Sequence, residues 1–269
     1  MRIIGVDFTS APRRTKPIAV AHGELRAGAL RVSALEALYD FAAFESLLER
    51  AGPWTGGFDF PFGLPFEMVR DLGWPRGWKR LVEFCGGLTR AELRATIDAY
   101  RATRPAGRKY AHRATDGPAG SSSPMKLVNP PVALMFHEGV PRLAAAGVHL
   151  PGLAEGDRAR VALEAYPGLL ARAVTRAPYK SDTRALQTPG RKAARRAIVA
   201  ALQRGRHPLE LTITFGARYI RQRLIEDASG DSLDAVLCAV QAGWAAVRPG
   251  WGLPRRIPRC EGWIVSAGA

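Results

Sequence analysis

The sequence predicts an α/β protein built as one domain with helical insertions. Short β-branched runs such as residues 2–8 (RIIGVDF) alternate with segments whose apolar residues recur at helical spacing. The 269 residues are 47% hydrophobic, which is enough to fill a core and excludes disorder for most of the chain. No internal repeat or linker divides the chain, so we treat residues 1–269 as a single domain.

The first sixty residues predict most of a sheet. We expect strands at residues 2–8, 16–21, 29–32 and 54–60. Between the last two, Phe44 and Leu48 belong to an apolar helical pattern that Asp40 suits as N-cap and that Gly52-Pro53 ends.

The rest of the chain mixes helices with long loops. Residues 65–103 look helical in pieces, with Thr89 and Glu92 forming a capping box. Residues 104–131 predict a loop, and Gly139 and Pro141 predict a break in the helical pattern that follows. The later elements are a strand at 160–165, helices at 189–204 and 229–247, and a closing strand at 262–265.

The net charge of +15 is concentrated in three segments. Residues 101–113 carry +5, residues 171–206 carry +9 and residues 248–259 carry +4, so the remainder is slightly acidic. Arg-rich composition accounts for part of this excess, but its clustering favours a phosphate-bearing ligand or a polyanion. The candidate phosphate contacts in the first two segments are Arg108, Lys109, Arg113, Lys180, Arg184, Arg191 and Lys192.

Several common site types are missing from the sequence. It contains no Walker phosphate loop, no dinucleotide-binding G-x-G-x-x-G after a strand and no G-x-S-x-G nucleophile elbow. Its three cysteines are far apart, and no apolar run reaches the length of a membrane span. We therefore expect a cytoplasmic protein with no membrane partner.

Carboxylates at the ends of apolar strands are the most informative feature. Asp7, Asp59 and Glu164 each follow or end a predicted strand, where an unpaired buried charge is costly. Asp231 and Asp234 stand at i, i+3 on one face of a helix start. Such oxygen ligands suit Mg²⁺ or Mn²⁺, and two such ions promote phosphodiester hydrolysis.

Each of these acids also has a structural interpretation. Asp59 is a candidate turn residue before Pro61, and Glu164 a candidate partner for a neighbouring Arg. Asp231 and Asp234 equally suit the stabilisation of a helix N-terminus.

Six short segments, in order, resemble a known family. They are GVDFTSAP (5–12), FDFPFGLP (58–65), LEAYPGLL (163–170), YKSDTR (179–184), GDSLDAVLCA (230–239) and EGWIV (261–265). They are similar to those of domain of unknown function 429, a bacterial and archaeal family predicted to contain RNase H-like nucleases. The matches run from residue 5 to residue 265.

The resemblance implies an RNase H-like core, with a mixed five-stranded sheet flanked by helices. In it, three antiparallel strands precede two parallel ones, and a last helix brings the final acids. Asp7, Asp59, Asp231 and Asp234 match the family's acids, whereas Glu164 and Lys180 match positions without an established role. Residues 65–157 would then be a large insertion that narrows the cleft toward a small substrate.

Three functions follow as hypotheses. The first is a metal-dependent nuclease in which the acids hold Mg²⁺ or Mn²⁺ and the basic residues hold nucleic acid. Trp74 and Trp78 are then either base-stacking residues or core aromatics. The second is a non-catalytic nucleic-acid-binding protein, and the third an actin-like ATPase or kinase, for which DFTS at residues 7–10 resembles a phosphate loop.

Overall fold

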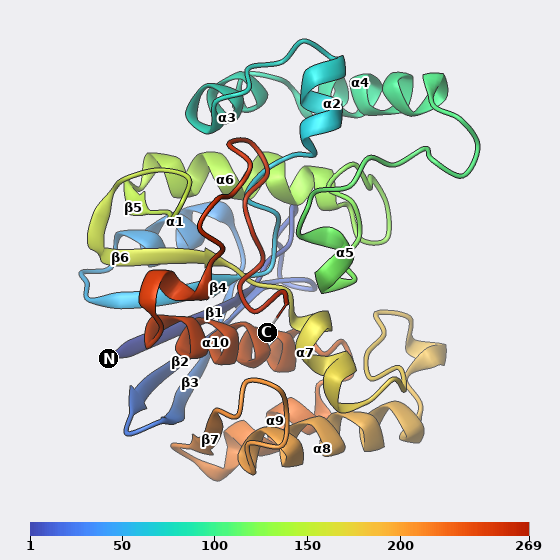
Figure 1. The fold of residues 1–269 in the computed structure, drawn as a ribbon. Coiled ribbons are helices and arrows are strands. Elements are labelled where there is room, and N and C mark those ends of the chain that lie inside the picture. Colours follow the sequence, from blue (N-terminus) through green and yellow to red (C-terminus); the bar gives the residue numbers. More distant parts are fainter. Residues whose placement is uncertain (269) are drawn as a thin grey trace.

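A seven-stranded mixed sheet runs through the computed structural model of the protein, which describes residues 1–268 (Figure 1). In spatial order the strands are β5 (Val148–His149), β6 (Asp157–Glu164), β4 (Trp54–Phe58), β1 (Arg2–Asp7), β2 (Ile18–Arg26), β3 (Ala29–Leu38) and β7 (Thr212–Phe215). β2 is antiparallel to β1 and β3, and every other neighbouring pair is parallel. The α/β class is therefore confirmed, but the expected count of five strands is wrong, because β5 and β7 extend the sheet at its two edges.

Helices cover both faces of the sheet because its central strands are apolar on both. In β1, Ile4 and Val6 pack into one core with residues of the helices that lie before β6 in the chain, whereas Ile3 packs into a second core with residues of the helices that follow β6. Successive side chains of a strand point to opposite faces, so a continuous apolar run is what a strand buried on two sides requires.

The face that carries the second core is approached very closely by α10 (Asp231–Ala246). A Cβ atom at Gly5 would lie 1.9 Å from the carbonyl oxygen of Ala235, and one at Gly57 would lie 2.4 Å from that of Cys238. Glycines in β1 and β4 thus let the backbone of this helix lie directly against the sheet.

Between β4 and β6 the chain builds a set of helices, the first three of which lie at the top of the view in Figure 1. Its helices are α2 (Phe66–Asp71), α3 (Trp78–Gly86), α4 (Arg90–Thr103), α5 (Asp116–Ala119) and α6 (Val132–Ala145). The capping box of Thr89 and Glu92 is confirmed at the start of α4. The expected break in α6 is wrong, because the helix runs through Pro141. Its packing against α3, and of Gly139 against Phe60, outweighs the local preference.

The remaining helices are α1 (Phe41–Glu49), capped by Asp40 as expected, α7 (Pro167–Val174), α8 (Pro189–Gln203) and α9 (Arg218–Glu226). Two short 3₁₀ helices, η1 (Arg184–Leu186) and η2 (Pro249–Gly252), lie in the connections. The closing strand expected at 262–265 is reduced to a single bridge between Ile264 and Glu164. Within residues 1–268, no helix combines the length and apolar character that a membrane crossing requires.

Candidate active site

Asp7 and Asp59 stand side by side at the ends of two parallel strands. Val6 of β1 pairs with Phe58 of β4, so the acids are the next residue on each chain, and the Asp59 amide donates to the Val6 carbonyl at 2.9 Å. Val6 and Phe58 face the first core, and alternation turns both acids toward α10. There the two carboxyl groups lie close enough for the charge of Asp59 to raise the pKa of Asp7.

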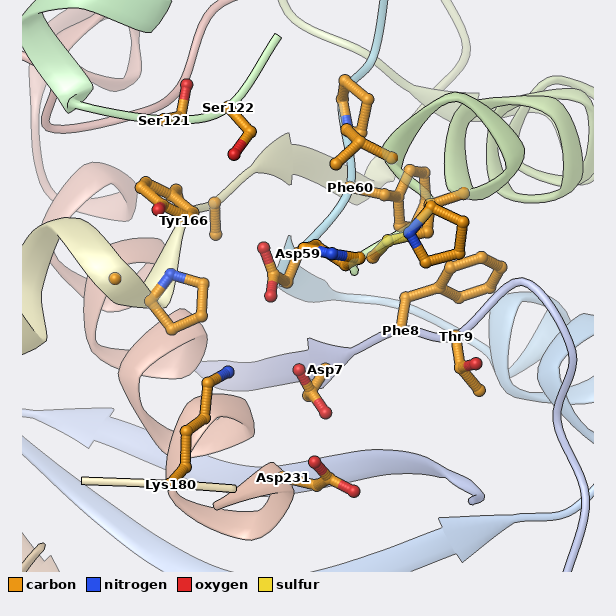
Figure 2. A pocket seen from close by; sticks show the side chains of 18 of the residues that line it. Asp7, Phe8, Thr9, Asp59, Phe60, Ser121, Ser122, Tyr166, Lys180 and Asp231 are labelled. Carbon is orange, nitrogen blue, oxygen red and sulfur yellow. The ribbon is translucent and has the colours of Figure 1, made fainter. Parts of the chain in front are cut away.

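The start of α10 brings two more carboxylates to the same place. Gly230 precedes the helix with φ of +81°, a conformation that favours glycine, and a Cβ there would lie 2.6 Å from the Cβ of Lys180. The i, i+3 spacing then places Asp231 and Asp234 on one side of the first turn. Figure 2 shows Asp7 between Asp59 and Asp231, with Lys180 beside them.

Two lysines are paired with the acids of α10. The buried carboxylate of Asp234 accepts from the Tyr179 hydroxyl at 2.6 Å and from the Lys180 ammonium. Lys16 Nζ donates to the two oxygens of Asp231 at 2.9 and 3.0 Å, and to Asp182 at 2.9 Å.

The lysines leave negative charge in excess. Burial, followed by the charges of Asp234 and Asp231, raises the pKa of Asp7 well above its usual range. Burial raises the pKa of Asp59 to about 7, against the opposing effect of Lys180. Burial acts to lower the pKa of Lys180, but the charges of Asp234 and the other acidic groups around it together raise that pKa well above its usual value. An additional cation would therefore be stabilised between these groups.

A pocket of about 640 Å³ opens over the acids. Its floor includes Asp7, Asp59, Asp231 and Lys180, and its walls come from the ends of β1 and β4, the start of α7 and the segment between α5 and α6.

Glu164 lines the same pocket but belongs to a buried ion-pair network. Its two carboxylate oxygens accept from Arg113 at 2.7 and 2.9 Å, and the Phe62 amide donates to it at 2.9 Å. Arg113 also donates to the buried Asp116 at 2.9 Å. The structural interpretation of Glu164, as the partner of an arginine, is the one that this geometry shows, and the same pairing engages Arg113.

Of the seven basic candidates, Lys180 and Arg113 line the pocket, and the other five do not. Lys192 pairs with Glu226 at 2.6 Å, and Arg191 donates to the Lys180 carbonyl. Arg184 lies on η1, and residues 108–109 are exposed in the loop after α4. Trp74 and Trp78 are buried, so their interpretation as base-stacking residues is wrong.

Several residues that shape the site were not singled out from the sequence. Lys16 and Asp182 stand in segments that looked like a strand start and a basic loop, and their contacts with α10 are long-range. Tyr179 adjoins Lys180 in YKSDTR, and Tyr166 follows the predicted strand at 160–165. For Tyr179, the signal that the sequence offers is its position directly before a lysine in an otherwise polar loop.

The donor chemistry of this cluster fits a hard divalent cation, since all the donors are carboxylate oxygens. Within residues 1–268, no three His, Cys, Asp or Glu side chains are arranged around one point as a bound metal requires. The carboxylates of α10 are instead turned to the two lysines.

Comparisons with protein-family models, with curated proteins and with solved structures each returned no match for this chain.

Proposed function

We propose that the protein is a nuclease with an RNase H-like core, dependent on Mg²⁺ or Mn²⁺ and related to domain of unknown function 429. The observation that carries the proposal is the meeting of Asp7, Asp59 and Asp231 at one pocket, with the buried Asp234 close enough for its charge to raise the pKa of Asp7. The strand order β3-β2-β1-β4-β6 within the larger sheet supports it, since the resemblance implies that order of antiparallel and parallel strands.

The acids would hold the metal, with Asp7 and Asp59 supplying oxygens from the strands and Asp231 and Asp234 from α10. When bound, the ion supplies an activated water and neutralises the charge of the leaving oxygen. In the hydrolysis, water adds to phosphorus, the P–O ester bond breaks and the leaving oxygen takes up a proton. Lys180 lies where it can contact a phosphate oxygen of the substrate, and it is oriented by the Asp234 carboxylate, which also accepts from the Tyr179 hydroxyl.

The test compares Asp7→Asn with Asp98→Asn, a control at a carboxylate whose side chain is 61% exposed on α4. We expect Asp7→Asn to lose Mn²⁺-dependent cleavage of an oligonucleotide and most of the Mn²⁺-induced rise in Tm, while the control keeps both. Cleavage by Asp7→Asn at the wild-type rate would contradict the proposal.

A non-catalytic nucleic-acid-binding protein is the second candidate, favoured by the lysines that already pair with Asp231 and Asp234. It predicts salt-dependent binding without turnover, and binding that survives in Asp7→Asn. The actin-like alternative requires a duplicated core, whereas residues 1–268 form one sheet. We further propose a cytoplasmic location, which fits the free and buried state of Cys85, Cys238 and Cys260.

A further inference from the structure

The wall that faces the acids comes from the segment between α5 and α6. Ser121, Ser122 and residues 129–132 line the pocket from this side. In Figure 2 the two serines lie across the pocket from Asp7 and Asp231. A substrate that reaches the acids must therefore fit between them and this segment.

Hydrogen bonds hold this wall in place. Arg172 of α7 donates to the carbonyl of Ala119 at 2.7 Å and to that of Gly120 at 3.1 Å. On the other side of the serines, the Ser123 hydroxyl donates to the Ala111 carbonyl at 2.5 Å. The pocket is thus formed before any substrate arrives.

The size and charge of the pocket suit a small group. Its volume of about 640 Å³ falls within the range of about 300–1,000 Å³ that is usual for small-molecule sites. Among the described residues, the cations that line it are Lys16, Arg113, Arg172 and Lys180, and Arg113 is buried in its ion pairs. A protein that makes about 6–10 phosphate contacts along a duplex needs a longer row of cations than this pocket offers.

The lining is apolar on one side and polar on the other. Phe60, Pro61, Val132 and Met135 contribute an apolar surface, and the half-buried ring of Tyr166 lies on the side of the two serines. Enzymes that act on single bases or strand ends use this combination, with apolar contacts for the base plane and polar groups for its edge.

From these walls we infer that the site takes one unpaired terminal nucleotide unit together with its phosphodiester, and does not admit the middle of a strand or of a duplex. The inference rests on the proposed nuclease function and names its substrate class. Such a unit occurs both at the free end of a single strand and in a small free dinucleotide.

In the experiment, the 269-residue protein with Mn²⁺ is tested on five phosphodiester substrates, and the oligonucleotides share one sequence. These are bis(4-nitrophenyl) phosphate, a dinucleotide, a linear single-stranded oligonucleotide, the same oligonucleotide closed into a circle, and a blunt duplex. We expect turnover of the first three, with the circle and the duplex at least about tenfold slower. Faster cleavage of the dinucleotide would identify the free nucleotide as the source, and faster cleavage of the oligonucleotide the strand end.

Two results would overturn the inference in different ways. Equal cleavage of circle, duplex and linear strand would refute the pocket argument and leave the nuclease proposal intact. Turnover of none of the five would refute the nuclease proposal, and the inference with it.

Tyr166 offers an independent check on the aromatic wall. Tyr166→Ala should raise KM for the linear oligonucleotide about tenfold, the scale of a lost base-stacking contact, with kcat changed less than about twofold. Tyr166→Phe keeps the ring and should keep the wild-type KM. An unchanged KM in Tyr166→Ala, or an equal change in both variants, would contradict a nucleotide bound at this wall.

Discussion

Replacing Arg113 with Met leaves two buried carboxylates without their arginine. The Arg113 side chain is 2% exposed and bonds both Glu164 and Asp116, whose side chains are 2% and 0% exposed. Methionine retains much of the apolar stem of the side chain, so the substitution chiefly removes the charge and its hydrogen bonds.

The size of the effect follows from that burial. Removing one partner of a buried ion pair costs about 3–5 kcal/mol, because the remaining charge stays desolvated. Since one guanidinium serves both carboxylates, we expect a loss in the free energy of unfolding of at least about 3 kcal/mol. At roughly 2–4 °C per kcal/mol for a chain of this size, Tm should fall by about 6–20 °C.

Thermal unfolding of Arg113→Met and Arg158→Met measures this difference. Arg158 pairs with Glu155, and both side chains are 75% exposed, so breaking that pair should cost less than about 1 kcal/mol. The stability deficit of Arg113→Met should shrink toward acid pH, where the buried and now unpaired Glu164 takes up a proton, and it should also shrink in combination with Glu164→Gln. A Tm within about 2 °C of the Arg158→Met value would refute the reasoning.

Three further predictions concern the sheet and the acids. Gly5→Ala should lower the free energy of unfolding, measured in urea, by about 1–3 kcal/mol or more, because the added Cβ meets the backbone of α10. The control Gly77→Ala, which has open space around it, should change that free energy by less than about 0.5 kcal/mol. In EDTA, the pKa of Asp59 is about 7 in the folded protein, against an ordinary value of 3.8. The free energy of unfolding should therefore fall as pH rises between these two values, and Asp59→Asn should flatten this dependence of stability on pH. Lys180→Met should lower Tm in EDTA, because it leaves the buried Asp234 without its ammonium partner. Mn²⁺ should raise the Tm of this variant more than it raises the Tm of the wild type, since the metal ion supplies positive charge beside the buried acid. Equal Mn²⁺-induced shifts in Tm for both proteins would contradict this.

Local sequence patterns predicted the parts of the fold that depend on local chemistry. The apolar run before Asp7 and the N-cap at Asp40 identified a strand and a helix correctly. β7 and α9 escaped prediction because a four-residue strand gives almost no alternation, and because α9 buries few residues beneath its arginines.

The candidate site divides in the same way. Strand ends and i, i+3 spacing select Asp7, Asp59, Asp231 and Asp234, because an acid next to an apolar run is conspicuous in the sequence alone. The contact of Lys16 with Asp231 joins residues 215 positions apart and depends on how α10 is laid across the sheet. In the sequence alone, the glycines of β1 and β4 that permit this placement resemble any other strand residue, because the close approach of α10 is a long-range contact.

The lysines of the site do not make its acids a purely structural set. Lys16 and Lys180 are paired with Asp231 and Asp234, while among the described residues Asp7 and Asp59 have no ion pair. Two adjoining carboxyl groups of this kind lower the free energy of unfolding, as their raised pKa values show. An amide or an apolar residue at either position would stabilise the fold at least as well. The proposed binding protein has no use for that arrangement, whereas the proposed metal-dependent enzyme would use it, because an ion that relieves the repulsion would also supply the chemistry. Asp59→Asn therefore separates the two candidates: it should stabilise the metal-free protein near pH 8 and abolish cleavage, where a structural role predicts no change in nucleic-acid turnover or binding.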